Sequence, residues 1–274
     1  MTALGATLRR LRMESGLGLR DLARRLGVSS AYLSRVEHGL DAPPTPERLE
    51  AVAAELGVPP ALLLEVGHRL SPFVERYAEH EPQAAALFLA IARRGLDADE
   101  IAEIHRFVER RFPREAAVSK AQRAGKLASA IEPDRVVVGL QCGSLADAYE
   151  IGAARLAALR GMPPVDRLAA MFRERDDEIG AGVGGGVVVP CTVVANARAA
   201  AAIVVIDPPL AVSTPDGVPV AVVVQYVVPV RSGDSLVRIA HVARLAARGL
   251  AASLSGIEHP DEVVRRIARL EAID

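Results

Sequence analysis

The fold of the first part of the chain is decided by LRDLARRLGVSSAYLSRVEHG, residues 19–39. Leu19–Leu26 predicts one helix, with Gly27 in the position of a C-cap. Ser29 suits the N-cap of a second helix, Ser30–His38. Apolar residues on both helices predict that the pair packs as a bend, which leaves the first residues of the second helix facing outward. Side chains that read base edges in a DNA groove need this arrangement.

Three more helices are expected around this pair. A leucine repeat at helical spacing predicts a helix over residues 4–11 that stops before Gly16. Glu47–Leu56 predicts the fourth helix, and the proline pair at 59–60 opens the fifth. Residues 1–67 are therefore expected to form an all-α domain of five helices.

Positive charge is concentrated in this segment, whereas the whole chain has a net charge of −1. Residues 1–40 contain seven arginines and three acidic residues, 7 − 3 = +4. The arginines are Arg9, Arg10, Arg12, Arg20, Arg24, Arg25 and Arg35. Phosphate contacts need such a patch, so a local basic face is expected. Aromatic residues make up 3% of the chain and tryptophan is absent, which disfavours an aromatic platform for single strands.

Residues 4–66 share four sequence features with a known family of proteins. These are the LRxLR opening at Leu8–Arg12, the segments DLARRLGVS and YLSRVEHG, and the loop at Pro44. They resemble the Xre-type helix-turn-helix family, the group of the lambda Cro and phage repressors. The resemblance implies sequence-specific binding to double-stranded operator DNA as a dimer. The candidate DNA-binding residues are Arg20, Ser29, Ser30, Ala31, Tyr32, Ser34, Arg35 and His38.

These candidates are expected to differ in role. Arg35 suits a two-point contact to the O6 and N7 atoms of guanine, with a phosphate contact as the alternative. Arg20, at the start of the first helix of the pair, is expected to contact the DNA backbone. For Tyr32, a contact against the backbone and a place in the core both stay open. Glu37 is expected to hold the following turn and to read no base.

A helical connector is expected over residues 68–126. Two amphipathic helices are predicted between Phe73 and Phe112, parted by Gly95–Asp97, and residues 113–125 predict a polar linker. The apolar stripes consist of Leu87, Ile91, Ile101, Ile104, Phe107 and Val108. Two interpretations stay open, because such helices either form a dimerisation element or pack on the neighbouring domains.

An α/β domain is expected over residues 127–274, because apolar strands alternate with amphipathic helices. This pattern predicts a mixed sheet flanked by helices on both faces. The expected strands are Val136–Leu140, Val187–Val189, Ala202–Ile206 and Val220–Val230. The expected helices are Leu145–Leu159, Val165–Arg173, Ser235–Ala252 and Asp261–Leu270. The chain is thus predicted to be multidomain.

A glycine-rich stretch, RDDEIGAGVGGGVVVPC, occupies residues 175–191 of this domain. Its glycines permit positive φ and let backbone N–H groups approach an anion. The order of motifs over Leu127–Leu270 resembles the enzyme IIA domain of the fructose/mannitol and nitrogen-regulatory phosphotransferase systems. Arg175-Asp176 matches the Arg-Glu pair of that family, and Ala181-Gly182-Val183-Gly184 matches its Thr-Gly-Ile-Gly loop.

Both active-site histidines of that family are replaced here. Val188-Val189-Pro190 matches its Ala-Ile-Pro strand, and Cys191 stands at the phosphoacceptor position. Ser235 stands at the second histidine position, and His241 lies too far along the helix to replace it. The resemblance therefore implies a degenerate phosphoacceptor or sensor pocket. Its candidate residues are Arg175, Gly182, Gly184, Cys191 and Ser235.

Without these histidines, ordinary histidine phosphotransfer is not expected. Three interpretations of Cys191 stay open: an inert small side chain, a thiolate phosphoacceptor, and a site of oxidation. The two cysteines, Cys142 and Cys191, predict no disulfide framework and no metal site, and no cofactor is expected.

The domain order favours a cytoplasmic, dimeric transcriptional regulator that is not an enzyme. Its expected partners are operator DNA, a second copy of the chain, and a protein or small anionic ligand at the α/β domain. No membrane segment is expected from the sequence. The alternatives are a phosphotransfer component that uses Cys191 and an antitoxin-like protein that binds a partner and regulates its own operon.

Overall fold

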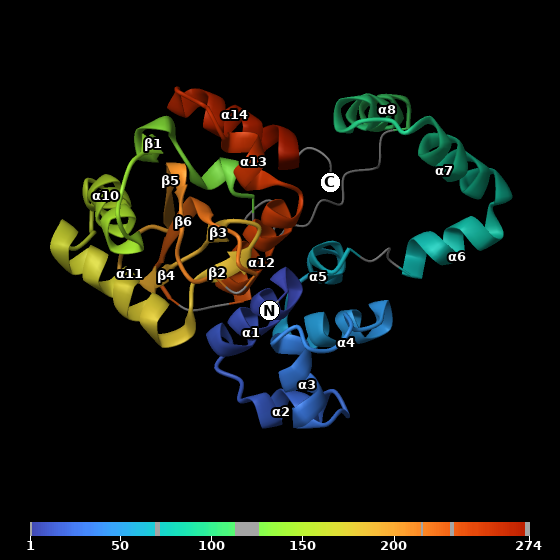
Figure 1. The fold of residues 1–274 in the computed structure, drawn as a ribbon, viewed down its shortest axis with the longest axis horizontal. Helices are drawn as coiled ribbons and strands as arrows, with labels where there is room; N and C mark the ends of the chain where they lie inside the picture. Colours follow the sequence, from blue (N-terminus) through green and yellow to red (C-terminus); the bar gives the residue numbers. More distant parts are fainter. Residues whose placement is uncertain (1, 69–71, 113–125, 215, 231–232, 272–274) are drawn as a thin grey trace.

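The computed structural model describes residues 2–68, 72–112, 126–214, 216–230 and 233–271. Figure 1 shows three parts: a bundle of short helices, a group of three helices that stands apart, and an α/β part around one sheet. The expected multidomain class, with helices first and a mixed sheet flanked by helices afterwards, is confirmed.

Five short helices form the first part, as expected. Their bounds are α1 Ala3–Glu14, α2 Leu19–Arg25, α3 Ser30–Glu37, α4 Pro46–Leu56 and α5 Pro60–Val66. Local signals set these ends. Ser29 accepts a hydrogen bond from the Tyr32 N–H and caps α3, and Thr45 caps α4 in the same way. Gly57 ends α4 in the left-handed conformation, with φ +67.

The connector contains three helices where the sequence predicted two. They are α6 Pro72–His80, α7 Pro82–Arg94 and α8 Ala98–Arg111. The extra break falls at Glu81, because Pro82 has no N–H to donate and begins a new helix at its first position. Asp97 caps α8 through a capping box with Glu100. The predicted linker, 113–125, lies outside the described residues.

A six-stranded mixed sheet organises the α/β part. Its strands are β1 Val136–Leu140, β2 Gly182–Gly184, β3 Val187–Val188, β4 Cys191–Val193, β5 Ala200–Leu210 and β6 Val220–Val228. The order is β1-β5-β6-β3-β2, and β4 also pairs with β6. The pair β5–β6 is antiparallel, whereas β1 runs parallel to β5 and both β3 and β4 run parallel to β6. The sequence prediction omitted β2 and β4, which are three residues each.

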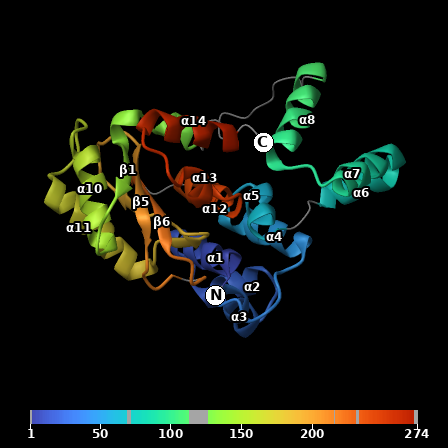
Figure 2. The same cartoon turned by 45° about the horizontal axis from the view of Figure 1, so that its top comes forward.

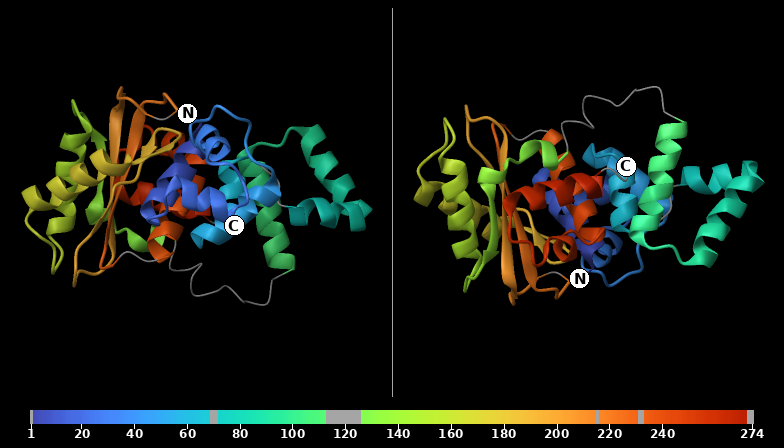
Figure 3. Two further views of the ribbon diagram at one scale, coloured as in Figure 1. Left: turned by 90° about the horizontal axis from the view of Figure 1, so that it is seen from below. Right: turned by 90° about the horizontal axis from the view of Figure 1, so that it is seen from above.

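Helices cover both faces of this sheet, as Figures 2 and 3 show. On one face lie α10 Leu145–Ala157 and α11 Val165–Ile179; on the other lie α12 Gly233–Ala247, α13 Leu250–Leu254 and α14 Pro260–Glu271. Two predicted helices needed correction. The helix expected over 235–252 is broken at Gly249, whose φ is +84, and α11 continues past Arg173 to Ile179.

The five-helix bundle packs on the same side of the sheet as α12. One continuous apolar core joins Leu4, Leu8 and Leu11 of α1 to Val183 of β2 and Leu245 of α12. A second core fills the space between the sheet and the pair α10–α11. The first helices and the α/β part therefore share buried surface. Within the described ranges, no helix is both long and apolar enough to span a membrane.

Candidate nucleic-acid interface and glycine-loop site

The helix pair α2–α3 presents an open groove to solvent. Arg20 and Asp21 line one side, and Ser30, Ala31 and Ser34 line the other. Leu22 of α2 and Leu33 of α3 pack together beneath the groove. Their burial turns the opposite face of α3 outward, so the structure brings together four of the expected DNA-binding residues: Arg20, Ser30, Ala31 and Ser34.

Arg35 lies one turn beyond Ala31 on the exposed side of α3. Its Nε donates to both carboxylate oxygens of Asp41, at 3.0 and 3.1 Å. The hydrogen bond to Asp41, helped by the charge of that carboxylate, raises the pKa of the Arg35 guanidinium above its ordinary value. Because only Nε contacts Asp41, the edge formed by the two terminal nitrogens is left for a two-point contact.

Three expected DNA-binding residues have structural contacts in this chain. Ser29 caps α3. Tyr32 is half-buried, and the Arg48 guanidinium lies 5.2 Å from the centre of its ring. His38 Nδ1 lies 2.7 Å from the backbone oxygen of Ser34 at the end of α3. Asp41 and Arg48 were not identified from the sequence, because both follow α3 in chain order and reach it only through the fold.

The basic face is smaller than the arginine count predicted. Arg10 and Arg12 are buried and form ion pairs with Glu14 and Glu37. The remaining arginines of this segment keep solvent contact, with Arg24 paired to Asp21 and Arg25 to Glu55. Glu37 was expected to hold the following turn, but its side chain is buried and pairs with Arg12 of α1.

The glycine loop in the α/β part is held by two carboxylates of the chain itself. Asp216 Oδ2 accepts the Gly185 N–H at 2.7 Å, so the anion next to this loop is an aspartate. Asp176 accepts the Ala181 N–H and the Tyr149 hydroxyl. Burial, together with the charge of Asp176, raises the pKa of Tyr149.

Most of the candidate pocket residues are buried. Cys191, on β4, is 7% exposed, and Arg175, Gly184 and Ser235 are also buried. Gly182 is partly exposed and pairs with Val188. The structure places Ser235 in the first turn of α12.

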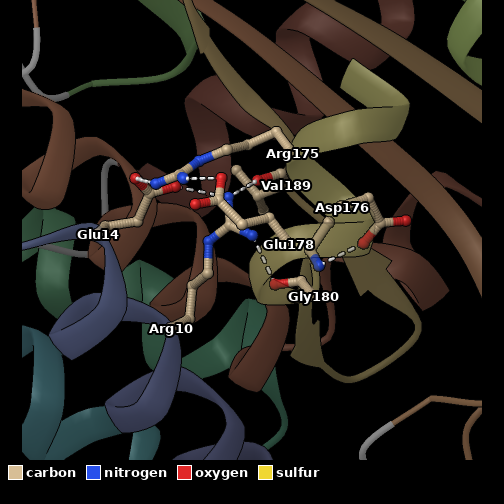
Figure 4. A network of polar contacts seen from close by, with 8 residues as sticks. Arg10, Glu14, Arg175, Asp176, Glu178, Gly180 and Val189 are labelled. Carbon is tan, nitrogen blue, oxygen red and sulfur yellow. Dashed lines mark hydrogen bonds and ion pairs between the residues drawn. The ribbon is translucent and has the colours of Figure 1, made fainter. Parts of the chain in front are cut away.

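An arginine of α1 reaches this loop. Arg10 donates from Nη1 to the Gly180 carbonyl and from Nη2 to the Val189 carbonyl (Figure 4). Glu14 accepts from both Arg10 and Arg175, and Arg175 also donates to Glu178. Arg10 is 1% exposed, and its burial lowers the pKa of the guanidinium, whereas the charge of Glu14 acts in the opposite direction. From the sequence, Arg10 was counted only as part of the basic patch of residues 1–40, so this contact was missed.

The fold and the groove define a helix-turn-helix domain, and the comparisons with known proteins agree. A family described as "Helix-turn-helix domain" matches residues 3–66. The chain is 37% identical over 65 residues to the HTH-type transcriptional regulator SinR of Bacillus subtilis (strain 168), covering 24% of this chain and 59% of SinR. It is 34% identical over 79 residues to the HTH-type transcriptional regulator RghRB of the same organism, covering 29% and 57%. The chain thus spans less than two thirds of either relative.

Among solved structures, the chain is similar to the nitrogen regulatory protein IIA-Ntr from Neisseria meningitidis, at 21% identity and a TM-score of 0.46. The match covers 51% of this chain and 97% of that protein.

Proposed function

We propose that this chain is a sequence-specific DNA-binding transcriptional regulator of the cytoplasm that catalyses no reaction. In this proposal residues 1–67 bind DNA and residues 127–274 form an enzyme IIA-like interaction domain, and residues 68–126 connect these two domains. The observation that carries it is the open groove between the starts of α2 and α3, in the segment that matches helix-turn-helix domains.

The groove suits duplex DNA because small side chains point outward at the start of α3. Ser30 and Ala31 are short enough to let the helix approach base edges in a major groove. Arg20 lies at the start of α2, where a phosphate contact would fix the orientation of the helix pair. Arg35 extends the same exposed surface with its guanidinium held at one end by Asp41.

Capture of genomic DNA tests this proposal. Full-length protein, the Arg35→Ala variant and the Arg167→Ala variant are each incubated with fragmented genomic DNA, and the bound fragments are sequenced. Arg167 is exposed on α11, away from the groove, so Arg167→Ala is a control that also removes one arginine charge. We expect enriched sites for the wild type and for Arg167→Ala, and their loss for Arg35→Ala. Folded wild-type protein that enriches no site contradicts the proposal.

We further propose that the regulator is a homodimer joined through α6–α8. None of the thirteen residues of α7 is buried. Leu87, Phe88 and Leu89 of α7 and Phe107 and Val108 of α8 are exposed large apolar side chains. Helices with so little core of their own gain stability by burying such faces against a partner.

The charges along α8 favour a second copy as that partner. The first half of the helix contains only acidic charged residues, Asp99, Glu100 and Glu103, whereas the second half is net basic, with Arg106, Arg110 and Arg111 against Glu109. If the two-fold axis of the dimer lies perpendicular to α8, the two α8 helices run antiparallel, and the acidic half of each then lies beside the basic half of the other. The same symmetry matches palindromic half-sites in DNA.

Molar mass in solution tests the dimer. The double variant Leu87→Glu/Phe107→Glu is compared with Ile151→Glu, which changes an exposed apolar residue of α10. We expect sedimentation equilibrium to give twice the chain mass for the wild type and for Ile151→Glu, and the chain mass for the double variant. A monomeric wild type, or a double variant that stays dimeric, contradicts the assignment of this interface.

For the α/β domain we propose an interaction role. Its sequence resembles enzyme IIA, but Cys191 and Ser235 stand where that family has its histidines. The burial of Cys191 does not favour the phosphotransfer alternative, since a phosphoryl donor must reach the acceptor atom.

A further inference from the structure

The first helix has two different faces, and each packs on a different part of the chain. Leu4, Leu8 and Leu11 pack into the apolar core of the helix bundle. A second row, at positions 3, 7, 10 and 14, recurs at helical spacing and faces β2 and the end of α11. The helix therefore serves the DNA-binding domain and the α/β domain at once.

The second row contacts the surface formed by residues 180–189 and Arg175 of α11, here called the glycine-loop surface. Thr7 Oγ1 donates to the Val183 carbonyl of β2 at 3.2 Å. Arg10 donates to the carbonyls of Gly180 and Val189, which lie on either side of the loop. Glu14 then accepts from Arg175 of α11. These groups are buried or partly buried, so the contact is a formed interface, although the Nε atoms of Arg10 and Arg175 have no hydrogen-bond partner among the described residues.

The loop allows the helix to come this close because it has no side chain at Gly184. A Cβ there would lie 2.4 Å from Ala3 Cβ and 2.8 Å from Ala3 Cα. Gly184 also has a φ of +91, a conformation that favours glycine. The close approach and the backbone conformation thus both require glycine at this point.

A second contact fixes the bundle to the same domain. Glu65 at the end of α5 accepts from Arg248, which directly follows α12, with 2.6 Å between Glu65 Oε2 and Arg248 Nη2, and it lies 3.6 Å from Arg244 of α12. The bundle is therefore held at two places, by Glu14 on α1 and by Glu65 on α5.

We propose that the glycine-loop surface around Cys191 is a docking surface whose occupant is α1 of the same chain. The surface binds a helix that places a cation against the carbonyls of Gly180 and Val189 and an anion against Arg175. Any other protein or small ligand that uses this surface must displace α1, so its binding is linked to the position of the DNA-binding domain. This inference does not depend on DNA binding by the chain.

Thiol reactivity of the full-length chain tests this docking. Cys191 is 7% exposed beside α1, whereas Cys142 is partly exposed and lies after β1, so Cys142 is an internal reference. The two cysteines are labelled with a maleimide, and the rate at each is followed by peptide mass spectrometry. In the wild type we expect Cys191 to react much more slowly than Cys142.

Charge reversal and its rescue then identify α1 as the cover. Glu14→Arg places a positive charge beside Arg10 and Arg175 and so weakens the docking of α1. We expect the labelling rate of Cys191 to rise roughly tenfold, which corresponds to a loss of about 1.4 kcal/mol in the free energy of docking. The Cys142 rate should not change. The double variant Glu14→Arg/Arg175→Glu restores opposite charges between positions 14 and 175 but leaves like charges beside Arg10 and Glu178, so the Cys191 rate should return part of the way to the wild-type rate. An unchanged Cys191 rate in Glu14→Arg overturns the proposal.

A milder variant covers the case in which Glu14→Arg unfolds the chain. Unfolding is recognised by faster labelling of both cysteines. Arg10→Met keeps a long side chain but removes the donors to Gly180 and Val189. Faster labelling of Cys191 alone in Arg10→Met supports the docking of α1, and an unchanged rate overturns it.

Discussion

Arg12 of α1 and Glu37 of α3 form a buried ion pair with two parallel hydrogen bonds. Nε donates to Oε1 at 2.6 Å and Nη2 donates to Oε2 at 2.8 Å, and the Glu37 side chain is 2% exposed. The pair ties the helix that contacts the α/β domain to the helix that lines the groove.

Removal of Arg12 should strongly destabilise the chain. Arg12→Ala leaves the carboxylate of Glu37 buried without its cation, and we expect the free energy of unfolding to fall by about 3–5 kcal/mol. Urea denaturation measures this. Arg24→Ala is the control, because its pair with Asp21 is exposed and should contribute at most about 1 kcal/mol. Equal losses of unfolding free energy in the two variants would show that the Arg12–Glu37 pair contributes no more to stability than an exposed pair.

Gly5→Ala should weaken the same helix contact, although alanine is the better helix former. A Cβ at Gly5 would lie 2.5 Å from the Glu37 backbone oxygen and 2.7 Å from that of Val36. Since backbone atoms cannot rotate away, α1 must move off α3, and we expect a loss of about 1–3 kcal/mol. Gly233→Ala is the matched control, with no heavy atom within 4 Å of the added Cβ. Thermal unfolding of both variants decides; a Gly5→Ala variant as stable as Gly233→Ala contradicts the prediction.

The helix bundle could be predicted because its signals are local. Ser29 and Thr45 as caps and Gly57 as a stop mark helix ends within a few residues. The position of Arg10 could not be predicted, because its acceptor at Gly180 lies 170 residues away. A count of arginines gives the charge of a segment, but the burial of each one depends on partners that only the fold brings near.

The groove illustrates the same limit. Arg20, Ser30, Ala31 and Ser34 follow from helix periodicity, which fixes the outward face of α3. Asp41 contacts Arg35 from a turn after the helix, and no periodic pattern extends into that turn. The short strands β2 and β4 were missed for a related reason, since three residues are too few to show an alternating pattern.

Arg35 and Asp41 should affect DNA binding in different ways, provided that the chain binds DNA as proposed. Arg35→Ala removes the two-point donor, and we expect about 1–3 kcal/mol less affinity for the enriched site. Asp41→Ala removes a negative charge and frees the guanidinium, so affinity for unrelated DNA should rise while the ratio of specific to non-specific affinity falls. Fluorescence anisotropy on the two kinds of duplex at one salt concentration measures both. An unchanged ratio in Asp41→Ala argues against a positioning role for Asp41.

Glu271 should stabilise the α/β part from the end of α14. Its side chain is buried, with Glu271 itself 1% exposed, and it accepts hydrogen bonds from the backbone N–H groups of Leu127 and Ala128. It also lies 2.5 Å from His241 Nε2 of α12. Glu271→Ala leaves these buried donors unpaired, each at a cost of about 1–3 kcal/mol, so we expect a loss of several kcal/mol in urea denaturation. Glu258→Ala, which truncates an exposed glutamate just before α14, should change the stability by no more than about 0.5 kcal/mol. If the two variants unfold at the same urea concentration, Glu271 does not join the start of this domain to α12.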